Sequence, residues 1–288
     1  MIKLLRSTRP KQWVKNLFIF APLLFSENLF NASLVSKSVL AFISFCMLSG
    51  CVYIINDIMD LEKDKMHPIK RFRPLASGEV RVLSACIAAT LLFLVSLMLA
   101  YSLDRNFSII ALVYFLLNLA YSIRFKHIVI VDVFIVATGF FLRVLGGAEV
   151  IHVNVSSWLL ICTILLALFL AFSKRRHELV ILNEEAIQHR KILAEYSPYF
   201  LDQMISVVTA SIVVSYLLYT TSEETVTKFN TRALVLTVPF VLYGIFRYLY
   251  LVHQKEGGGN PTLELLNDKP LMFNMILWIL TAGIIIYV

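Results

Sequence analysis

Long apolar segments follow one another along most of the chain and are separated by short polar loops. A helix of about 20 mainly apolar residues is long enough to cross a bilayer. Nine segments are candidates for such helices, and they cover residues 13–30, 36–57, 81–103, 107–123, 128–148, 155–173, 202–221, 232–252 and 270–288. The first is the weakest, because Pro22, Ser26 and Glu27 interrupt or end it. The pattern predicts an all-α polytopic membrane bundle of nine transmembrane helices.

Two segments combine basic and apolar residues in a way that is typical of helices at a membrane surface. Residues 1–15 predict a short interfacial N-terminal helix that is broken near Pro10. Residues 174–199 place leucines and isoleucines at helical spacing and predict an amphipathic cap on the cytoplasmic face. Because the other loops are short, we expect residues 1–288 to form a single membrane domain.

The composition agrees with this class of protein. Hydrophobic residues make up 59% of the chain, charged residues 16%, and the mean hydropathy is +0.78. A soluble domain is nearer half apolar and a quarter charged. The net charge of +7 is typical of loops that contact anionic lipid head groups, so it does not indicate binding to nucleic acid.

The basic residues are distributed unevenly between alternate loops. With the N-terminus placed in the cytoplasm, the inside segments carry 20 lysines and arginines, whereas the outside segments carry four. The positive-inside rule therefore favours nine spans with the C-terminus outside. It predicts a multi-pass protein of the cell (inner or plasma) membrane whose polar loops, and hence its active site, face the cytoplasm.

An acidic cluster lies at the end of the second predicted span. Helical rotation of about 100° per residue puts four oxygen-bearing side chains on one face, namely Asn56, Asp57, Asp60 and Asp64. Such hard ligands suit Mg²⁺, which keeps waters and binds substrate phosphates through one or two carboxylates. The sequence therefore predicts a magnesium site formed by these four residues.

A basic run follows the acids directly. Lys70, Arg71 and Arg73 lie between Pro68 and Pro74, two prolines that stiffen the turn. Guanidinium groups bind phosphates bidentately, so acids that hold a metal next to bases that hold phosphate suggest a diphosphate substrate. A solvated loop is the simpler interpretation of the charges alone, and the one-face spacing of the acids argues against it.

Two ionisable residues lie inside the fifth predicted span. Asp132 and Arg143 are eleven residues apart, about three helical turns, and fall on nearly the same face. Ionisable groups within a span are costly and suggest function. Asp132 is near the cytoplasmic end, where it could simply reach water, whereas we expect Arg143 to face a polar cavity. Arg247, in the eighth predicted span, is expected either to snorkel towards the interface or to have a structural partner.

These motifs resemble a known family. The pattern Asn56-Asp57-x-x-Asp60-x-x-x-Asp64, at the end of the second of nine spans, resembles the UbiA superfamily of intramembrane prenyltransferases. Three other motifs resemble its decaprenyl-phosphate phosphoribosyltransferase branch: Arg9-Pro10-x-Gln12-Trp13-x-Lys15-Asn16, His67-Pro68-x-Lys70-Arg71-Phe72-Arg73-Pro74 and Lys174-Arg175-x-x-Glu178-Leu179. The resemblance covers nearly the whole chain and implies a bundle around a central cavity that is capped on the cytoplasmic side.

The branch implies Mg²⁺-dependent transfer of a 5-phosphoribosyl group. The donor would be phosphoribosyl diphosphate, the acceptor a polyprenyl (decaprenyl-type) phosphate, and the product a precursor of cell-envelope glycans such as arabinan. Aromatic prenyltransferases of the superfamily resemble one another in a second acid-rich motif after the sixth span. This chain has Lys174, Arg175 and Arg176 there, which suits a donor with more phosphate groups.

The resemblance and the charge pattern together assign residues to roles. Asp57, Asp60, Lys70 and Arg71 are the predicted catalytic residues. The predicted substrate-binding residues are Lys15, Asn16, Arg73, Tyr121, Lys126, Arg143, Lys174, Arg175 and Glu178. Which phosphate each base binds stays open. The acceptor is already an anion, so the reaction needs no strong general base.

Two alternatives remain from the sequence. A prenyltransferase that moves a prenyl chain to an aromatic or quinone-precursor acceptor would carry a second carboxylate motif. A non-enzymatic lipid-binding or transport protein would carry polar groups on both faces and along a path through the spans. The expected partners are phosphoribosyl diphosphate, polyprenyl phosphate and the membrane, and a homo-oligomer is compatible with the sequence.

Overall fold

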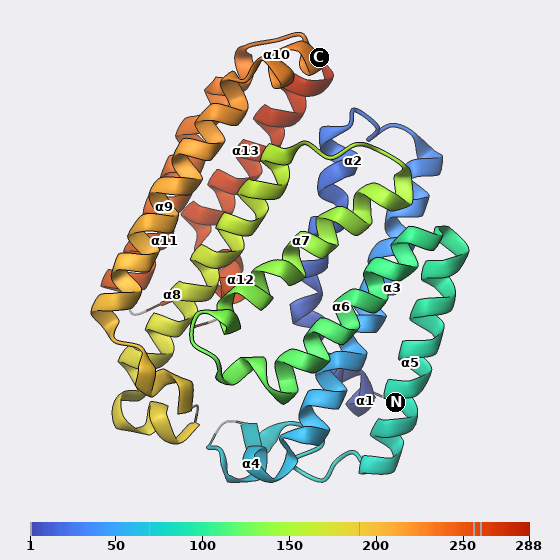
Figure 1. Ribbon diagram of the computed structural model, residues 1–288, viewed down its shortest axis with the longest axis vertical. Helices are drawn as coiled ribbons and strands as arrows, with labels where there is room; N and C mark the ends of the chain where they lie inside the picture. Colours follow the sequence, from blue (N-terminus) through green and yellow to red (C-terminus); the bar gives the residue numbers. More distant parts are fainter. Residues whose placement is uncertain (1, 69, 190, 256, 260) are drawn as a thin grey trace. The chain divides into compact units, whose positions relative to one another are not determined.

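The computed structural model describes residues 2–68, 70–189, 191–255, 257–259 and 261–288, and every regular element among them is a helix (Figure 1). The helices divide into two compact units. The first unit contains residues 1–126 and 142–154, and the second contains residues 127–141 and 155–288. Helix α7 (Val131–Ile151) contributes to both units.

Within the described residues, eight helical segments are long and apolar enough to cross a membrane. Besides α7, these are α3 (Ala32–Met59), α5 (Val82–Leu103), α6 (Arg105–Ile123), α8 (Ser157–His189), α9 (Pro198–Thr221), η5 (Ala233–Thr237) continued by α11 (Val238–Gln254), and α13 (Lys269–Tyr287). They confirm eight of the nine predicted spans as candidate membrane helices. The short helices α10 (Glu223–Phe229) and α12 (Pro261–Asn267) precede η5 and α13.

The prediction that residues 13–30 form one membrane helix is wrong. The chain forms α1 (Ile2–Ser7), the 3₁₀ helix η1 (Pro10–Phe20) and α2 (Ala21–Phe25). Pro10 and Pro22 each lie in the first turn of their helix, where a missing N–H has no intrahelical partner to lose. The predicted break near Pro10 is therefore confirmed, and a second helix start interrupts the segment at residue 21.

The predicted cap at residues 174–199 is not a separate amphipathic helix. Helix α8 runs from Ser157 to His189, so residues 174–189 continue a spanning helix. The chain then forms η4 (Lys191–Glu195) before α9 begins at Pro198. The arginine at position 190 lies outside the described residues. The location of this segment relative to a membrane stays a prediction.

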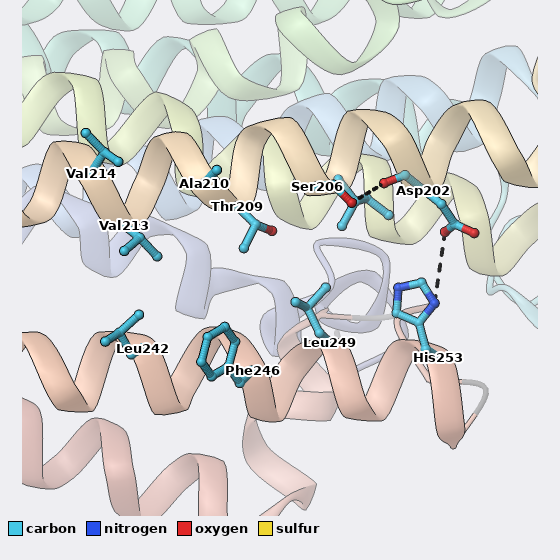
Figure 2. Close-up of a pocket in the computed structure, with 11 residues that line it drawn as sticks. Asp202, Ser206, Thr209, Ala210, Val213, Val214, Leu242, Phe246, Leu249 and His253 are labelled. Carbon is cyan, nitrogen blue, oxygen red and sulfur yellow. Dashed lines mark hydrogen bonds and ion pairs between the residues drawn. The ribbon is translucent and has the colours of Figure 1, made fainter.

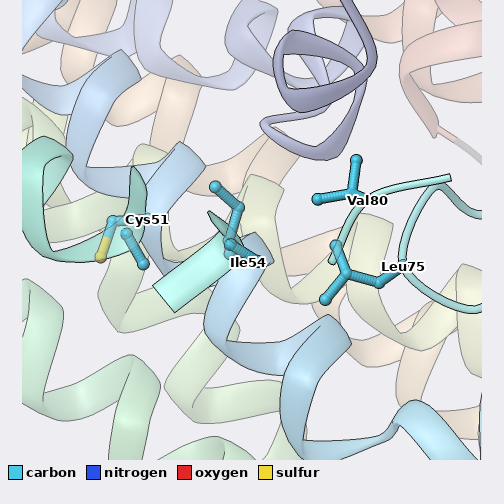
Figure 3. Packing of buried hydrophobic residues seen from close by; sticks show 6 residues of the cluster. Cys51, Ile54, Leu75 and Val80 are labelled. Atoms are coloured by element: carbon cyan, nitrogen blue, oxygen red, sulfur yellow. The ribbon is translucent and has the colours of Figure 1, made fainter. Parts of the chain in front are cut away.

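The polar stretch after α3 is anchored to the first unit by apolar side chains. It contains α4 (Leu61–Met66) and η2 (Lys70–Phe72), and then a turn in which Gly78 has a φ of 77°. Leu75 and Val80, on either side of that glycine, pack against Cys51 and Ile54 of α3 (Figure 3). This burial holds the basic run against the end of α3.

Candidate functional site

The four predicted metal ligands lie where α3 passes into α4. Asn56 and Asp57 belong to the last turn of α3, Asp60 caps its end, and Asp64 lies in α4. The expected single helix therefore ends at Met59. The backbone N–H of Asp60 still donates to the carbonyl of Asn56, and that of Asp64 donates to the carbonyl of Asp60 at 2.8 Å. Helical spacing continues across the boundary, which keeps Asp57 and Asp64 close together.

Two arginines neutralise the buried acids. Nη1 of Arg73 lies 3.2 Å from Oδ1 of Asp57 and 2.5 Å from Oδ2 of Asp64. Arg9 donates from Nη2 to the same Oδ1 of Asp57, and its guanidinium lies 4.8 Å from the centre of the Tyr53 ring. Because both carboxylates are buried, they need such cationic partners to remain charged.

Sequence reasoning did not select Arg9 as a site residue. Arg9 lies 48 residues from its partner Asp57, and no local pattern links the two. It connects α1 to η1 with a left-handed backbone, φ 52° and ψ 65°. A non-glycine residue in this region is strained by about 1–3 kcal/mol, and such residues gather at functional sites.

The other two predicted ligands contact residues near the end of α6. Nζ of Lys126, in η3 (Phe125–His127), lies 3.2 and 3.4 Å from the two carboxylate oxygens of Asp60. Oγ of Ser122 donates to Oδ1 of Asn56 at 2.5 Å. The structure therefore brings Lys126 to the acids, and it places Tyr121, half-buried, next to Ser122.

The three bases of the predicted phosphate clamp, Lys70, Arg71 and Arg73, differ in their surroundings. Arg73 lies against the acids, as described above. Lys70 is half-buried in η2, and Arg71 is exposed with its guanidinium 4.9 Å from the centre of the Phe72 ring. Only part of the basic run therefore faces the acids, while Arg71 extends towards solvent.

The chemistry of this cluster fits a magnesium ion. Three carboxylates and one amide are the oxygen ligands that Mg²⁺ prefers. One arginine nitrogen already lies at a point shared by Asp57 and Asp64, so a cation can be held there. Among the described residues, no three His, Cys, Asp or Glu side chains stand at metal-ligand spacing. Metal binding would therefore require Arg73 to move away from the two acids.

A second polar cluster lies deeper in the first unit. Arg143 of α7 is buried, and it donates from Nε to Oδ1 of Asn16 and from Nη2 to the Tyr114 hydroxyl, each at 2.8 Å. The amide of Asn16 also donates to Oγ of Ser49 on α3 at 3.2 Å. Gly147 permits this close packing, because a Cβ there would lie 2.1 Å from the carbonyl oxygen of Ile19 in η1.

The second unit contains a separate buried network around Arg175. Its Nε lies 2.7 Å from Oδ2 of Asp132, and its Nη1 lies 2.8 Å from Oε2 of Glu178. The Tyr196 hydroxyl donates to Oδ1 of Asp132 at 2.9 Å and accepts from the N–H of Ile130. Burial, reinforced by the charge of Asp132, raises the pKa of Tyr196 to about 12, so the hydroxyl stays protonated.

This network changes the interpretation of four predicted residues. Asp132 is fully buried, so the expectation that it could simply reach water is wrong. Arg175 and Glu178, predicted to bind substrate, contact each other, and Nζ of Lys174 lies 3.7 Å from Oε1 of Glu178.

Of the two predictions for Arg247, the structural partner is confirmed, since its guanidinium meets Asp268 at 2.8 and 3.1 Å.

A groove of about 490 Å³ lies between α9 and α11 in the second unit (Figure 2). Apolar side chains line most of its length, and Asp202 and His253 stand together at one end. Asp202 also accepts from Nε of Arg176 at 2.5 Å. None of the residues predicted to bind substrate lines this groove.

Comparisons with known proteins identify the family and the fold to which this chain is similar. The UbiA prenyltransferase family model matches residues 17–265. The chain is 32% identical to decaprenyl-phosphate phosphoribosyltransferase of Mycolicibacterium smegmatis, over 99% of this chain and 92% of that protein. It is 30% identical to the protein of the same name from Corynebacterium glutamicum, over 99% of this chain and 87% of that protein. The fold is similar to a UbiA homolog from Archaeoglobus fulgidus bound to GPP and Mg²⁺, with a TM-score of 0.74, 20% identity, and coverage of 99% of this chain and 100% of that chain.

Proposed function

The chain belongs to the UbiA prenyltransferase family, and we propose that it transfers a 5-phosphoribosyl group from phosphoribosyl diphosphate to a polyprenyl phosphate. The two relatives are named decaprenyl-phosphate phosphoribosyltransferases. The observation that carries the proposal is the cluster in the first unit, in which Arg9, Arg73 and Lys126 converge on buried or half-buried aspartates. Such a cluster suits a highly anionic donor.

The chemistry proceeds by displacement at the ribose. An oxygen of the lipid phosphate attacks C1, the bond from C1 to the diphosphate breaks, and the bonding electrons leave with the diphosphate. The acceptor is already an anion, so no side chain has to remove a proton from it. Positioning and electrostatic stabilisation would supply most of the rate.

Residues of the first unit would have two separate roles in this reaction, metal binding and phosphate binding. Asn56, Asp57, Asp60 and Asp64 would hold Mg²⁺, which when bound neutralises charge on the leaving diphosphate. Arg73, released from the acids, would bind phosphate oxygens with Lys70, Arg71 and Lys126. The pairing of Arg73 with Asp57 and Asp64 keeps the buried acids neutralised until donor and metal arrive.

The described side chains that follow the sixth predicted span give no support for a prenyl diphosphate donor. The aromatic prenyltransferases would need a second acid-rich motif after the sixth predicted span. Glu178, the acid of the Lys174-Arg175-x-x-Glu178 motif there, contacts Lys174 and Arg175. These contacts support a structural role for Arg175 and Glu178, and we therefore propose that they position α8 and do not clamp a phosphate.

We also propose that η1 and α2 make a ninth crossing, which keeps the cluster of acids in the cytoplasm. A 3₁₀ helix rises about 2.0 Å per residue and an α-helix about 1.5 Å, so the two together are about 30 Å long, the thickness of the hydrocarbon core. Figure 1 shows α2 at the end of α3 opposite α4, as a crossing requires.

Single cysteines on a background free of the four native cysteines test this topology. Asn28→Cys follows α2, and Glu62→Cys lies in α4. In right-side-out vesicles, an impermeant maleimide should label position 28 before lysis and position 62 only after lysis. Labelling of both positions from the same side would refute the ninth crossing.

The reaction itself is tested with purified protein in detergent. Radiolabelled phosphoribosyl diphosphate, Mg²⁺ and a polyprenyl phosphate should yield label in the lipid phase, and a chelator should abolish it. Labelling from a prenyl diphosphate with an aromatic acceptor, and none from phosphoribosyl diphosphate at several lipid lengths, would replace the proposal with aromatic prenyl transfer.

A further inference from the structure

We propose that the groove between α9 and α11 binds one chain of a phospholipid whose head group carries a primary amine, with Asp202 and Arg176 as the head-group ligands. The inference goes beyond the proposed reaction, because the groove lies in the second unit and none of the residues predicted to bind substrate lines it. A lipid that binds the folded protein there would stabilise the second unit.

The groove has the size and the lining of a ligand site. Its volume of about 490 Å³ falls within the range of about 300–1,000 Å³ that is usual for such sites, which are mostly apolar with a few polar groups. The apolar part is formed by Ile205, Ala210, Val213 and Val214 of α9 and by Leu242, Phe246 and Leu249 of α11 (Figure 2). Val214 and Phe246 are both more than half exposed, so the groove opens at the surface of the unit, where a bilayer would present lipid chains.

The groove extends from one end of two candidate spans towards their middle. Asp202 is the fifth residue of α9, and His253 is the last but one of α11, so the polar end of the groove lies near the helix termini. The lining continues along α9 as far as Val214, twelve residues or about 18 Å further on. Half of a hydrocarbon core of about 30 Å is about 15 Å. The groove therefore matches one leaflet, as a lipid with its head group at the interface requires.

The polar end of the groove offers a partner for each charge of a zwitterionic head group. Nε of Arg176 lies 2.5 Å from Oδ1 of Asp202, and Nδ1 of His253 lies 4.0 Å from the same oxygen. Within the described part of the chain, Oδ2 of Asp202 and both Nη groups of Arg176 have no hydrogen bond or ion pair. An ammonium group suits the carboxylate oxygen, and a phosphate suits the guanidinium.

The charges at this end favour a primary amine over other head groups. Asp202 cancels the charge of Arg176, so the pair offers no excess positive charge to a lipid whose head group is only anionic. A polyprenyl phosphate is such a lipid. A quaternary amine has no N–H and cannot donate a hydrogen bond to Asp202, whereas a primary ammonium has three donors.

Thr209 supplies a polar group part of the way along the groove. Its hydroxyl is buried and has no hydrogen-bond partner among the described residues, whereas the hydroxyl of Ser206 donates to the carbonyl of Asp202 at 2.9 Å (Figure 2). Thr209 lies seven residues, or about 10 Å, beyond Asp202 along the helix. A phospholipid carries ester carbonyls between its phosphate and its chains. Threonine in a helix has two accessible rotamers, so its hydroxyl can turn to donate to such a carbonyl.

Direct binding to the purified, delipidated full-length protein in detergent tests the inference without relying on turnover. The probes are three phospholipids with identical chains and with ethanolamine, choline or glycerol head groups, each measured by the shift in thermal unfolding midpoint across a titration. Asp202→Asn removes the carboxylate charge, and Ala210→Phe fills the apolar part of the groove. The matched control is Val207→Phe, which adds bulk to an exposed position of α9 that does not line the groove.

The wild type should bind the ethanolamine lipid about tenfold more tightly than the choline lipid, as expected for one charge-assisted hydrogen bond. Asp202→Asn should bind the two lipids equally, and Ala210→Phe should weaken all three lipids by about tenfold or more, whereas Val207→Phe should behave as the wild type. Thr209→Val, which keeps the shape of the side chain, should weaken all three by about threefold.

Three results would overturn the inference. They are equal binding of the three lipids by the wild type, an ethanolamine preference that persists in Asp202→Asn, and unchanged binding by a folded Ala210→Phe. Tightest binding of the glycerol lipid would mean that positive charge alone selects the head group, and it would refute the amine.

The same variants distinguish other occupants of the groove. Binding of a polyprenyl phosphate that is lost in Ala210→Phe, without binding of the ethanolamine lipid, would assign the groove to the acceptor chain. A changed oligomeric state of Ala210→Phe, measured by light scattering and without any effect on lipid binding, would make the groove a contact between copies of this chain. Either outcome would refute the phospholipid site.

Discussion

Two ionic networks, one in each unit, use the same residue types and differ in how their cations meet solvent. In the first unit the carboxylates of Asp57 and Asp64 are 2% and 5% exposed, while their partners Arg9 and Arg73 are 29% and 27% exposed. In the second unit both partners are buried, since Arg175 is 4% exposed and Asp132 is fully buried. The cations of the first network can therefore leave for water or for a ligand, whereas Arg175 cannot.

This difference in exposure distinguishes a candidate functional site in the first unit from a structural ion-pair network in the second. Breaking a buried pair leaves an uncompensated buried charge, which costs about 3–5 kcal/mol. An arginine with more than a quarter of its side chain in solvent avoids most of that cost by rotating outward. The first network can exchange partners during a reaction cycle, and the second holds α7, α8 and the segment around Tyr196 together.

The largest effect is expected on activity in the first network. Asp57→Asn should lower phosphoribosyl transfer by about 10³-fold or more, because the buried charge that binds metal is lost. Its unfolding midpoint should fall by only a few degrees, since Arg9 and Arg73 can reach water. The matched control is Glu62→Gln, an acid of α4 that is 82% exposed and bonded to Lys65, and it should keep full activity. Normal turnover by Asp57→Asn would remove the distinction between the networks.

The second network should respond in the opposite way. Asp132→Asn removes the fully buried carboxylate that pairs with Arg175 and should lower the free energy of unfolding by about 3–5 kcal/mol, measured by chemical denaturation in detergent micelles. Glu178→Gln is the control, and because its carboxylate is 23% exposed it should cost less than half as much. If Asp132→Asn were as stable as the wild type but inactive, Asp132 would belong to the catalytic machinery.

Sequence patterns predicted the elements of these networks better than their pairings. The eight long helices could be located because continuous apolar runs report spans directly, as at residues 81–103 for α5. The clustering of Asp57 with Asp64 could also be predicted, because helical spacing persists across the cap at Asp60. Both predictions depend only on residues that are close to one another in the sequence.

The rest depended on contacts between distant parts of the chain. Arg9 is 48 residues from Asp57, and Arg175 is 43 from Asp132, so no periodicity could pair them. The predicted common face of Asp132 and Arg143 was misleading, since the two residues belong to different units and bind different partners. The prediction of residues 13–30 as one helix failed because η1 ends at Phe20 and a new helix, α2, begins at Ala21 with Pro22 in its first turn.

A smaller effect would sharpen the idea that Arg73 exchanges with metal. Arg73→Gln removes the cation between Asp57 and Asp64 and leaves two buried carboxylates that repel each other. The unfolding midpoint of this variant should then respond to Mg²⁺ at about a tenfold lower concentration than that of the wild type, equivalent to about 1.4 kcal/mol. Arg176→Gln, which removes the ion pair with Asp202 in the second unit, is the control and should not change the response. An identical Mg²⁺ response in all three proteins would show that Arg73 does not compete with metal.

The smallest effect concerns Tyr196, which orients Asp132 in the second network. Tyr196→Phe removes one hydrogen bond to a buried carboxylate and should cost about 1 kcal/mol near pH 8, with no change in the KM for either substrate. Because folding raises the pKa of this phenol from 10.0 to about 12, its stabilising contribution is complete below pH 10 and is lost as the pH rises towards 12. The free energies of unfolding of wild type and variant should therefore converge over that alkaline range. A KM change at constant stability would instead mean that the second network contacts substrate. Both networks would then take part in function, and the distinction between a functional and a structural network would be lost.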